Sequence, residues 1–216
     1  MKNSDAIPPT RGVSLDDWAK LIARPTIAPA GGSAAAAAGV LAAALVEMVA
    51  SLTAARESYA PVHEEARAAR ARAEGIRQEL LTLASADAES LRSFEEALAL
   101  PRGDDTEREH RERRKRDALR EGAEIQRDVL ADCAELAALG VALVERGLRN
   151  ARADAGTAVF LAAAGARSAA RAVAVNLTGE SEDSEFTGMA AAARRKLGEV
   201  EEAERVVERA LDGSPG

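Results

Sequence analysis

The sequence predicts an all-α fold, an antiparallel helical bundle with two Ala-rich helices at its centre. Apolar residues recur at helical spacing along most of the 216-residue chain, and no segment sustains the apolar–polar alternation of a strand. Two long segments, 34–55 and 154–177, are rich in alanine and almost free of charge. Such segments suit helices that other helices surround, so we expect them to pack side by side.

The composition indicates a thin core and an acidic surface. Hydrophobic residues make up 47 % of the chain but aromatic residues only 2 %, so Ala, Leu and Val must build the core, and we expect a homodimer to strengthen it. The formal net charge of −7 opposes non-specific binding to nucleic acid or to an anionic membrane. Because a lone cysteine, Cys133, cannot form an internal disulfide and no apolar signal region opens the chain, we expect a cytoplasmic protein.

An N-terminal arm precedes the expected helical domain. Residues 1–13 are polar and predict a flexible arm, whereas residues 14–216 predict a single domain. Ser14 caps a short amphipathic helix that runs to about Arg24, and Trp18 is expected to anchor this helix on the core.

The first Ala-rich helix is expected in the bundle rather than in a membrane. No charge appears from Ile27 to Val46, but Ala and Gly dominate this stretch, Pro29 interrupts it, and Glu47 ends the apolar run. Small residues spaced four apart form a smooth stripe on which another helix backbone can lie: Ala35, Gly39 and Ala43.

The middle of the chain predicts two helices in succession. Pro61 begins a helix that runs to about Leu83, and Ser85 restarts a helix that reaches Leu98. The segment Pro101-Arg102-Gly103 ends it, because Pro and Gly there favour a turn.

The second half predicts a long charged helix, the other Ala-rich helix and a final charged helix. Asp105 opens the longest charged segment, which Gly140 can bend or break. Asp154 leads the second Ala-rich helix to about Leu177, and residues 189–211 form the last helix. Basic and acidic residues nearly balance across 102–127, which favours an exposed helix with salt bridges, although a few arginines there remain candidates for an acidic ligand tail.

A small-residue loop before the first Ala-rich helix is the strongest candidate for a binding site. Gly31 and Gly32 free the backbone for close approach to a ligand, Ser33 can cap the helix, and the helix N-terminus favours anionic or carbonyl oxygens. The alternative is a capped helix packed tightly in a core.

Other polar residues lie at the expected ends of apolar helices. Asp154 either caps its helix or, as a partly desolvated carboxylate, holds a ligand amide or moves a proton. Asp87 is either a first-turn acid or a catalytic acid, and Tyr59 offers one hydroxyl. His63 and His110 lack the spacing of metal ligands, so we expect no metal.

Several short motifs follow one another in order along the chain. They are Pro29-Ala30-Gly31-Gly32-Ser33-Ala34-Ala35, Ser51-Leu52-Thr53 with Tyr59, Asp87-Ala88-Glu89-Ser90, Leu100-Pro101, Asn150, Asp154-Ala155-Gly156-Thr157-Ala158 and Asn176-Leu177. Together they resemble the formimidoyltetrahydrofolate cyclodeaminase and methenyltetrahydrofolate cyclohydrolase family, over most of the chain.

The resemblance implies a helical bundle that dimerises and binds a tetrahydrofolate derivative as cofactor near the glycine loop and the subunit interface. Members close an N5-formimino group onto N10 and release ammonia, or add water to the methenyl carbon. Both reactions move a proton beside a cationic carbon, which a buried carboxylate can stabilise. The implied catalytic residues are Asp154 and Asp87, and the implied cofactor-binding residues are Gly31, Gly32, Ser33, Tyr59 and Asn150.

Four places depart from the family pattern. Ala30 replaces a glycine of the loop, Ser85 stands where an acid is frequent, and Leu91 stands where an aromatic residue is usual. The lysines usual before Tyr59 are replaced by Arg56-Glu57-Ser58. Three hypotheses follow: a folate-dependent one-carbon enzyme, a divergent member that passes the carbon to another acceptor, and a non-catalytic helical dimer that serves as a binding or assembly partner.

Overall fold

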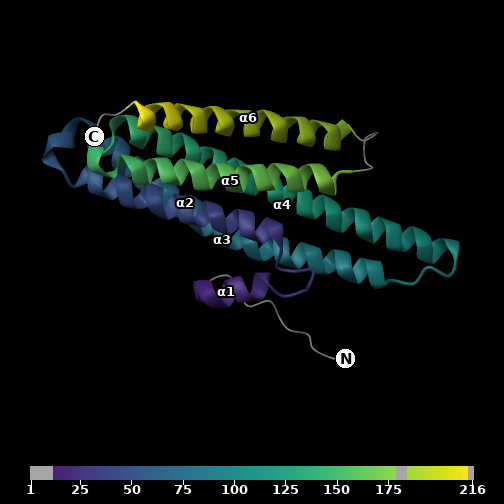
Figure 1. The fold of residues 1–216 in the computed structure, drawn as a ribbon. Coiled ribbons are helices and arrows are strands. Elements are labelled where there is room, and N and C mark those ends of the chain that lie inside the picture. Colours follow the sequence, from purple (N-terminus) through teal and green to yellow (C-terminus); the bar gives the residue numbers. More distant parts are fainter. Residues whose placement is uncertain (1–11, 179–183, 214–216) are drawn as a thin grey trace.

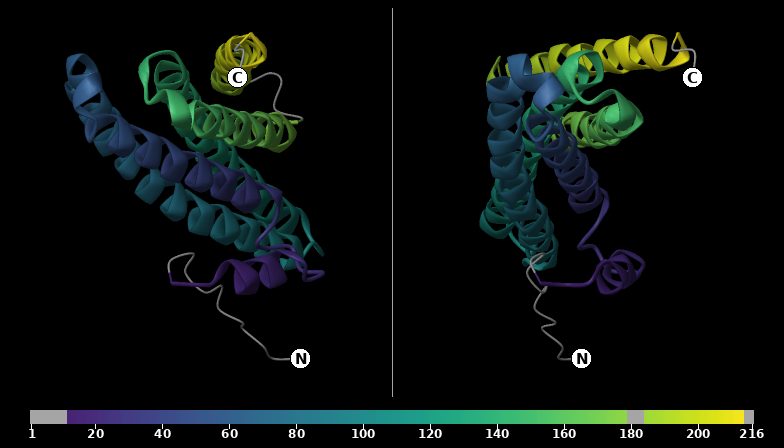
Figure 2. Two further views of the ribbon diagram at one scale, coloured as in Figure 1. Left: turned by 60° about the vertical axis from the view of Figure 1, so that its left-hand side comes forward. Right: turned by 90° about the vertical axis from the view of Figure 1, so that its left-hand side faces the viewer.

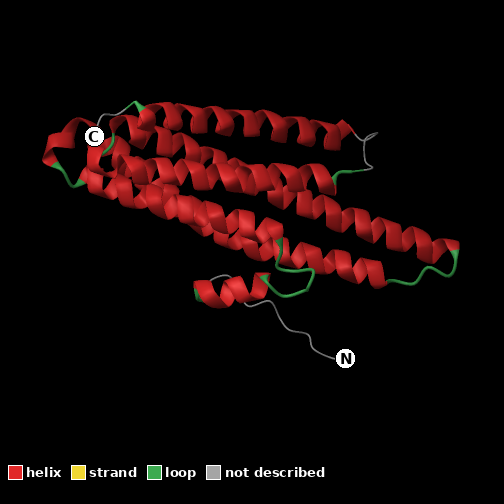
Figure 3. Cartoon of the chain, viewed as in Figure 1, coloured by secondary structure: helices red, strands yellow, loops and turns green. Residues whose placement is uncertain are grey.

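The computed structural model describes residues 12–178 and 184–213, and these residues form helices without a strand (Figures 1 and 3). This confirms the predicted all-α class. The expected arm, 1–13, lies almost entirely outside the described residues. In chain order the helices are α1 (Leu15–Ile22), α2 (Gly31–Ala54), the 3₁₀ helix η1 (Glu57–Val62), α3 (His63–Ala99), α4 (Asp105–Arg146), the 3₁₀ helix η2 (Arg149–Ala151), α5 (Arg152–Asn176) and α6 (Ser184–Asp212).

The helices α2 to α6 form an antiparallel bundle. Helix α2 packs on α3 and α5, while α5 also packs on α4 and α6, so the two Ala-rich helices lie at the centre as predicted. The two longest helices, α3 and α4, extend past the start of α2 and the end of α5 as a protruding hairpin (Figure 1). The starting end of α2 therefore lies against the middle of α3 and α4.

The two central helices touch through their backbones. A Cβ atom at Gly165 of α5 would lie 2.9 Å from the carbonyl oxygen of Ala35 and 2.9 Å from Sγ of Cys133. A Cβ atom at Gly39 of α2 would lie 3.0 Å from the same sulfur. This contact confirms the small-residue stripe predicted on α2. Both α2 and the segment Arg149–Asn176, which contains α5, are long and apolar enough to cross a membrane, and about half of each apolar window, 44 % and 50 %, is buried in the bundle.

Two predicted helix breaks are absent. Helix α3 runs without interruption through Ser85, whose hydroxyl donates to the carbonyl of Leu81 one turn earlier instead of capping a new helix. Helix α4 runs through Gly140, where a Cβ atom would lie 2.5 Å from a methyl carbon of Val159. The glycine therefore permits close packing of α4 on α5, which a sequence pattern cannot distinguish from a break.

Helix α1 forms as predicted, but it stands apart from the bundle. Ser14 caps it, with Oγ accepting a hydrogen bond of 3.1 Å from the backbone N–H of Asp17. No residue of α1 is buried, and Figures 1 and 2 show the helix away from the other helices. The prediction that Trp18 anchors α1 on the core is wrong, because an amphipathic pattern specifies an apolar face but not the partner of that face.

Candidate functional site

Ser33, in the first turn of α2, turns inward instead of capping the helix. The helix begins at Gly31, and its cap residue Ala30 makes no side-chain cap hydrogen bond. Ser33 is 1 % exposed, and its Oγ lies 2.8 Å from Oδ2 of Asp87 and 3.1 Å from the carbonyl oxygen of Ala84. The predicted capping role is therefore wrong, since the helix starts three residues earlier than a Ser33 cap requires.

Asp87 lies inside α3, where two other helices hold its carboxylate. Its Oδ1 accepts a hydrogen bond of 2.7 Å from Nε2 of Gln126 on α4, and its Oδ2 faces Ser33. The side chain is only 5 % exposed. The first-turn hypothesis for Asp87 is wrong, because α3 begins at His63. A fixed carboxylate in a water-poor site acts strongly on a nearby positive charge, as the catalytic hypothesis requires.

Gly32 allows the backbone of α2 to touch this carboxylate. A Cβ atom at this position would lie 2.2 Å from Oδ1 of Asp87 and 2.3 Å from Nε2 of Gln126, whereas one at Gly31 would meet nothing within 4 Å. Both glycines belong to the first turn of α2, so the expected flexible loop is a helix end. Only Gly32 shows the close approach that was predicted for the pair, and it is made to the protein's own side chains.

The polar contacts continue one turn along α4. A Cβ atom at Gly122 would lie 2.8 Å from Nδ2 of Asn176, at the end of α5, and 3.4 Å from Oγ of Ser90. Ser90 is buried and donates to the backbone carbonyl of Asp87, while Asn176 is half-buried. We name the following residues the polar seam, which joins α2, α3, α4 and α5: Ser33, Asp87, Ser90, Gln126 and Asn176.

The remaining candidate residues lie at the opposite end of α2. The hydroxyl of Tyr59, in η1, accepts a hydrogen bond of 3.0 Å from the backbone N–H of Arg149. Asn150 in η2 and Asp154 in the first turn of α5 are exposed. Since α2 has 24 residues, about 36 Å of helix separates these residues from the polar seam.

A single copy of the chain therefore does not bring the two groups of predicted site residues together. The polar seam collects Gly32, Ser33 and Asp87, whereas Tyr59 and Asp154 remain at the far end. The expectation that the Asp154 carboxylate is desolvated is not met within the protomer, because its place at the start of α5 leaves it exposed.

Comparison with known proteins decides the family. Formiminotransferase-cyclodeaminase is the family that matches, over residues 14–196. The chain belongs to this family. A methenyltetrahydrofolate cyclohydrolase from Methylorubrum extorquens is 35 % identical over 151 residues, which cover 70 % of this chain and 73 % of that protein. The crystal structure of formiminotetrahydrofolate cyclodeaminase from Thermotoga maritima has a TM-score of 0.82 and 26 % identity, and the match covers 94 % of this chain and 97 % of that one.

Family membership confirms the resemblance that the ordered motifs predicted. The matched residues include both groups of candidate site residues. Asp87 lies near the start of α2, and Tyr59, Asn150 and Asp154 lie near its end.

Gln126 is the member of the polar seam that sequence reasoning missed. It lies in α4 at the spacing of the buried apolar face and is 1 % exposed. A long polar side chain in an apolar register is the signal that could have identified it, because such a group is buried only where a partner holds it. Its neighbours in that register include Ala123, Val129, Leu130 and Cys133.

A second buried carboxyl, Asp132, lies on α4 away from the described seam contacts. Its pKa is raised to about 7, mainly by burial and next by the charge of Glu79, while Arg72 opposes the shift. Burial also raises the pKa of the Cys133 thiol to about 12, which agrees with the predicted core position. Among the described residues, no three His, Cys, Asp or Glu side chains gather as a metal site requires.

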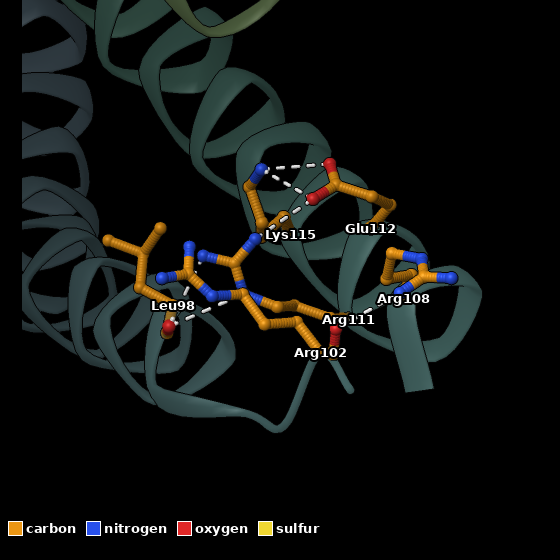
Figure 4. Close-up of polar contacts among 6 residues, drawn as sticks. All are labelled: Leu98, Arg102, Arg108, Arg111, Glu112 and Lys115. Carbon is orange, nitrogen blue, oxygen red and sulfur yellow. Dashed lines mark hydrogen bonds and ion pairs between the residues drawn. The ribbon is translucent and has the colours of Figure 1, made fainter. Parts of the chain in front are cut away.

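The Arg-rich segment forms ion pairs and helix caps at the tip of the hairpin (Figure 4). Arg111 donates to the carbonyl of Leu98 in the last turn of α3, with Nη2 3.3 Å from that oxygen. Lys115 pairs with both carboxylate oxygens of Glu112, at 2.9 and 2.8 Å, and Arg108 donates to two backbone carbonyls of the hairpin loop. The predicted exposed helix with salt bridges is confirmed, and these contacts account for several of its cations without a ligand.

Proposed function

We propose that this protein is a folate-dependent one-carbon enzyme whose substrate is 5,10-methenyltetrahydrofolate. Membership of the formiminotransferase-cyclodeaminase family supports a tetrahydrofolate one-carbon enzyme of the cyclodeaminase or cyclohydrolase type. The observation that favours the hydrolytic reaction is the 35 % identity to a protein named methenyltetrahydrofolate cyclohydrolase. In that reaction water adds to the cationic methenyl carbon, the bond from this carbon to N5 breaks, and one proton is released.

The polar seam offers the groups that this chemistry needs. The carboxylate of Asp87 can stabilise the cationic carbon and accept the proton of the attacking water. Gln126 and Ser33 each occupy one of its oxygens, which leaves further lone pairs for a water or for substrate. Beside it, the first turn of α2 has no side-chain cap, so its N–H groups are available to a carbonyl or carboxylate oxygen.

We further propose a homodimer that packs through α2. Three large apolar side chains on this helix are exposed, at 50 % for Leu41, 39 % for Met48 and 41 % for Leu52, and Leu45 beside them is half-buried. Their spacing places them on one face of α2, and an apolar face of this kind favours burial against a protein partner.

The arrangement of the copies decides whether the two ends of α2 meet. If the two-fold axis crosses α2 at a right angle, the helices of the two copies run antiparallel. The polar seam of one protomer then lies beside the Tyr59, Asn150 and Asp154 end of the other. Such a dimer unites all the residues that the family resemblance implies, which is the reason to prefer it over a parallel pair.

The test of the activity is an absorbance assay of the methenyl form with purified protein, run beside calorimetric binding of the same compound. Loss of methenyl absorbance with formation of 10-formyltetrahydrofolate supports the proposal. Formation of the methenyl form and ammonia from the 5-formimino compound would instead assign the cyclodeaminase reaction. Binding without either change would favour a different carbon acceptor, which the departures at Ala30, Ser85 and Leu91 also suggest.

The test of the dimer is light scattering of Met48→Glu, with Leu98→Glu as its matched control. Both side chains are similarly exposed, at 39 % and 42 %, but Leu98 lies on the hairpin far from the α2 face. We expect Met48→Glu to shift the protein to monomer and Leu98→Glu to leave the dimer intact. A wild-type monomer at assay concentrations would refute the proposed dimer.

A further inference from the structure

The side chain of Gln126 has a buried acceptor oxygen without a hydrogen-bond partner among the residues that the structure describes. Its Nε2 donates to Oδ1 of Asp87 at 2.7 Å. An ionised carboxylate only accepts hydrogen bonds, so this contact fixes which end of the amide faces Asp87. The other end, Oε1, has no hydrogen-bond partner among the residues that the structure describes, and the whole side chain is 1 % exposed. An acceptor in this position is costly unless something donates to it.

An apolar side chain would avoid this cost. Leucine and methionine fit the register that Gln126 occupies on α4, and either would bury no polar atom. An apolar residue would, however, leave Oδ1 of Asp87 without this donor, so the bond to Asp87 accounts for the Nε2 end of the amide. One end already has a partner, Asp87, so the second end is the part that needs explanation.

The seam beside Gln126 reaches the surface. Gly122, one turn earlier on the same side of α4, allows the amide of half-buried Asn176 to approach. Gly32 brings the start of α2 against Nε2 of the Gln126 amide, the end that donates to Asp87. Gln126 thus lies between the start of α2 and the half-buried end of the polar seam at Asn176.

We propose that Gln126 is both a positioning residue for Asp87 and a binding residue for the substrate. Its Nε2 holds the carboxylate in place, and its Oε1 accepts a hydrogen bond from an N–H group of the bound molecule. This inference rests on the proposed function, because reduced pterins carry several ring and amino N–H donors. It assigns recognition of the pterin part of the substrate to α4.

Two variants of Gln126 separate this role from simple packing. In Gln126→Met neither end can form its hydrogen bond, so the affinity for tetrahydrofolate should fall about tenfold to hundredfold at every pH. In Gln126→Glu two carboxyl groups face each other and share one proton in acid, so binding should be near wild type at about pH 6 and weak at about pH 8. The chain's other glutamine provides the control Gln78→Met, which should bind as wild type does.

The experiment is calorimetric binding of tetrahydrofolate at both pH values, with thermal melts to check that each variant folds. If Gln126→Met fails to fold, Gln126→Glu still tests the inference through its pH dependence. Wild-type affinity in Gln126→Met, or binding by Gln126→Glu that follows the wild-type pH profile, would overturn the role of Gln126 alone. Absence of binding by the wild-type protein would instead overturn the proposed folate function and this inference with it.

Discussion

The two ends of α2 place polar side chains in opposite settings. At its start, Ser33 meets Asp87, and the bonds of this buried group join side chains from three helices. At its end, Thr53 accepts from the backbone N–H of Leu148 at 2.9 Å, and nearby Tyr59 accepts from Arg149 in the same way. These side chains satisfy backbone N–H groups in the connection between two helices, which is a structural role. Buried side chains that bond one another present a preorganised group to a ligand, so the starting end is the better candidate for chemistry.

The largest effect is expected from Gly32→Ala, which changes the packing at the start of α2. The added methyl group overlaps Asp87 and Gln126, so either α2 shifts or the carboxylate moves. We expect a loss of about 2–3 kcal/mol of stability by urea unfolding and loss of folate binding. Gly31→Ala is the matched control and should change little, because nothing lies within 4 Å of its added atom. Equal behaviour of the two variants would contradict the description of the polar seam.

A smaller effect on activity, with none on the fold, is expected from Asp154→Asn. The side chain is exposed within the protomer, so its replacement should leave the melting temperature unchanged. If the far end of a second copy completes the site, turnover should fall about tenfold or more while light scattering still reports a dimer. Unchanged turnover would remove Asp154 from the site and restrict the chemistry to the polar seam.

Sequence patterns predicted the bundle well because helical spacing and chargeless segments reflect burial directly. They failed where the burial of a polar side chain depends on the packing of helices that are distant in sequence. The Gly-Gly-Ser segment resembles a loop in sequence, yet Ser33 is buried because α2 starts early and packs against α3. Asp87 resembled a first-turn acid because Ser85 suggested a new helix start. The structure instead has one continuous helix, α3, through Ser85. The pairing of Asp87 with Gln126 spans 39 residues, and no local pattern specifies it.

A pH-dependent effect on stability is expected from Asp132→Asn. Burial raises the pKa of Asp132 from 3.8 to about 7, so the folded state binds this proton more tightly than the unfolded state does. Wild-type stability from this group is therefore present in acid and is lost as the pH rises from about 4 to about 7. The substitution should remove most of that pH dependence in urea unfolding. Asp117→Asn, which removes an exposed acid farther along α4, should keep the wild-type profile.

The smallest effect is expected from Tyr59→Phe at the far end of α2. The change removes one hydrogen bond of 3.0 Å to the backbone N–H of Arg149, on a side chain that is already half-exposed. We expect a loss of about 1 kcal/mol in unfolding free energy, since water can replace the lost partner. If folate binding also falls by more than the stability loss explains, Tyr59 belongs to the binding site as the family resemblance implies.

The most direct test of the account is the turnover of 5,10-methenyltetrahydrofolate by the wild-type protein and by Asp87→Asn. We expect turnover by the wild-type protein and a fall of about a hundredfold or more in the variant, because the carboxylate charge beside the cationic carbon is lost. Binding and the helical fold should persist, since an amide fits the space of the carboxylate. Equal turnover in the two proteins would show that the reaction takes place away from the polar seam, and an inactive wild-type protein that binds no folate would refute the proposed function.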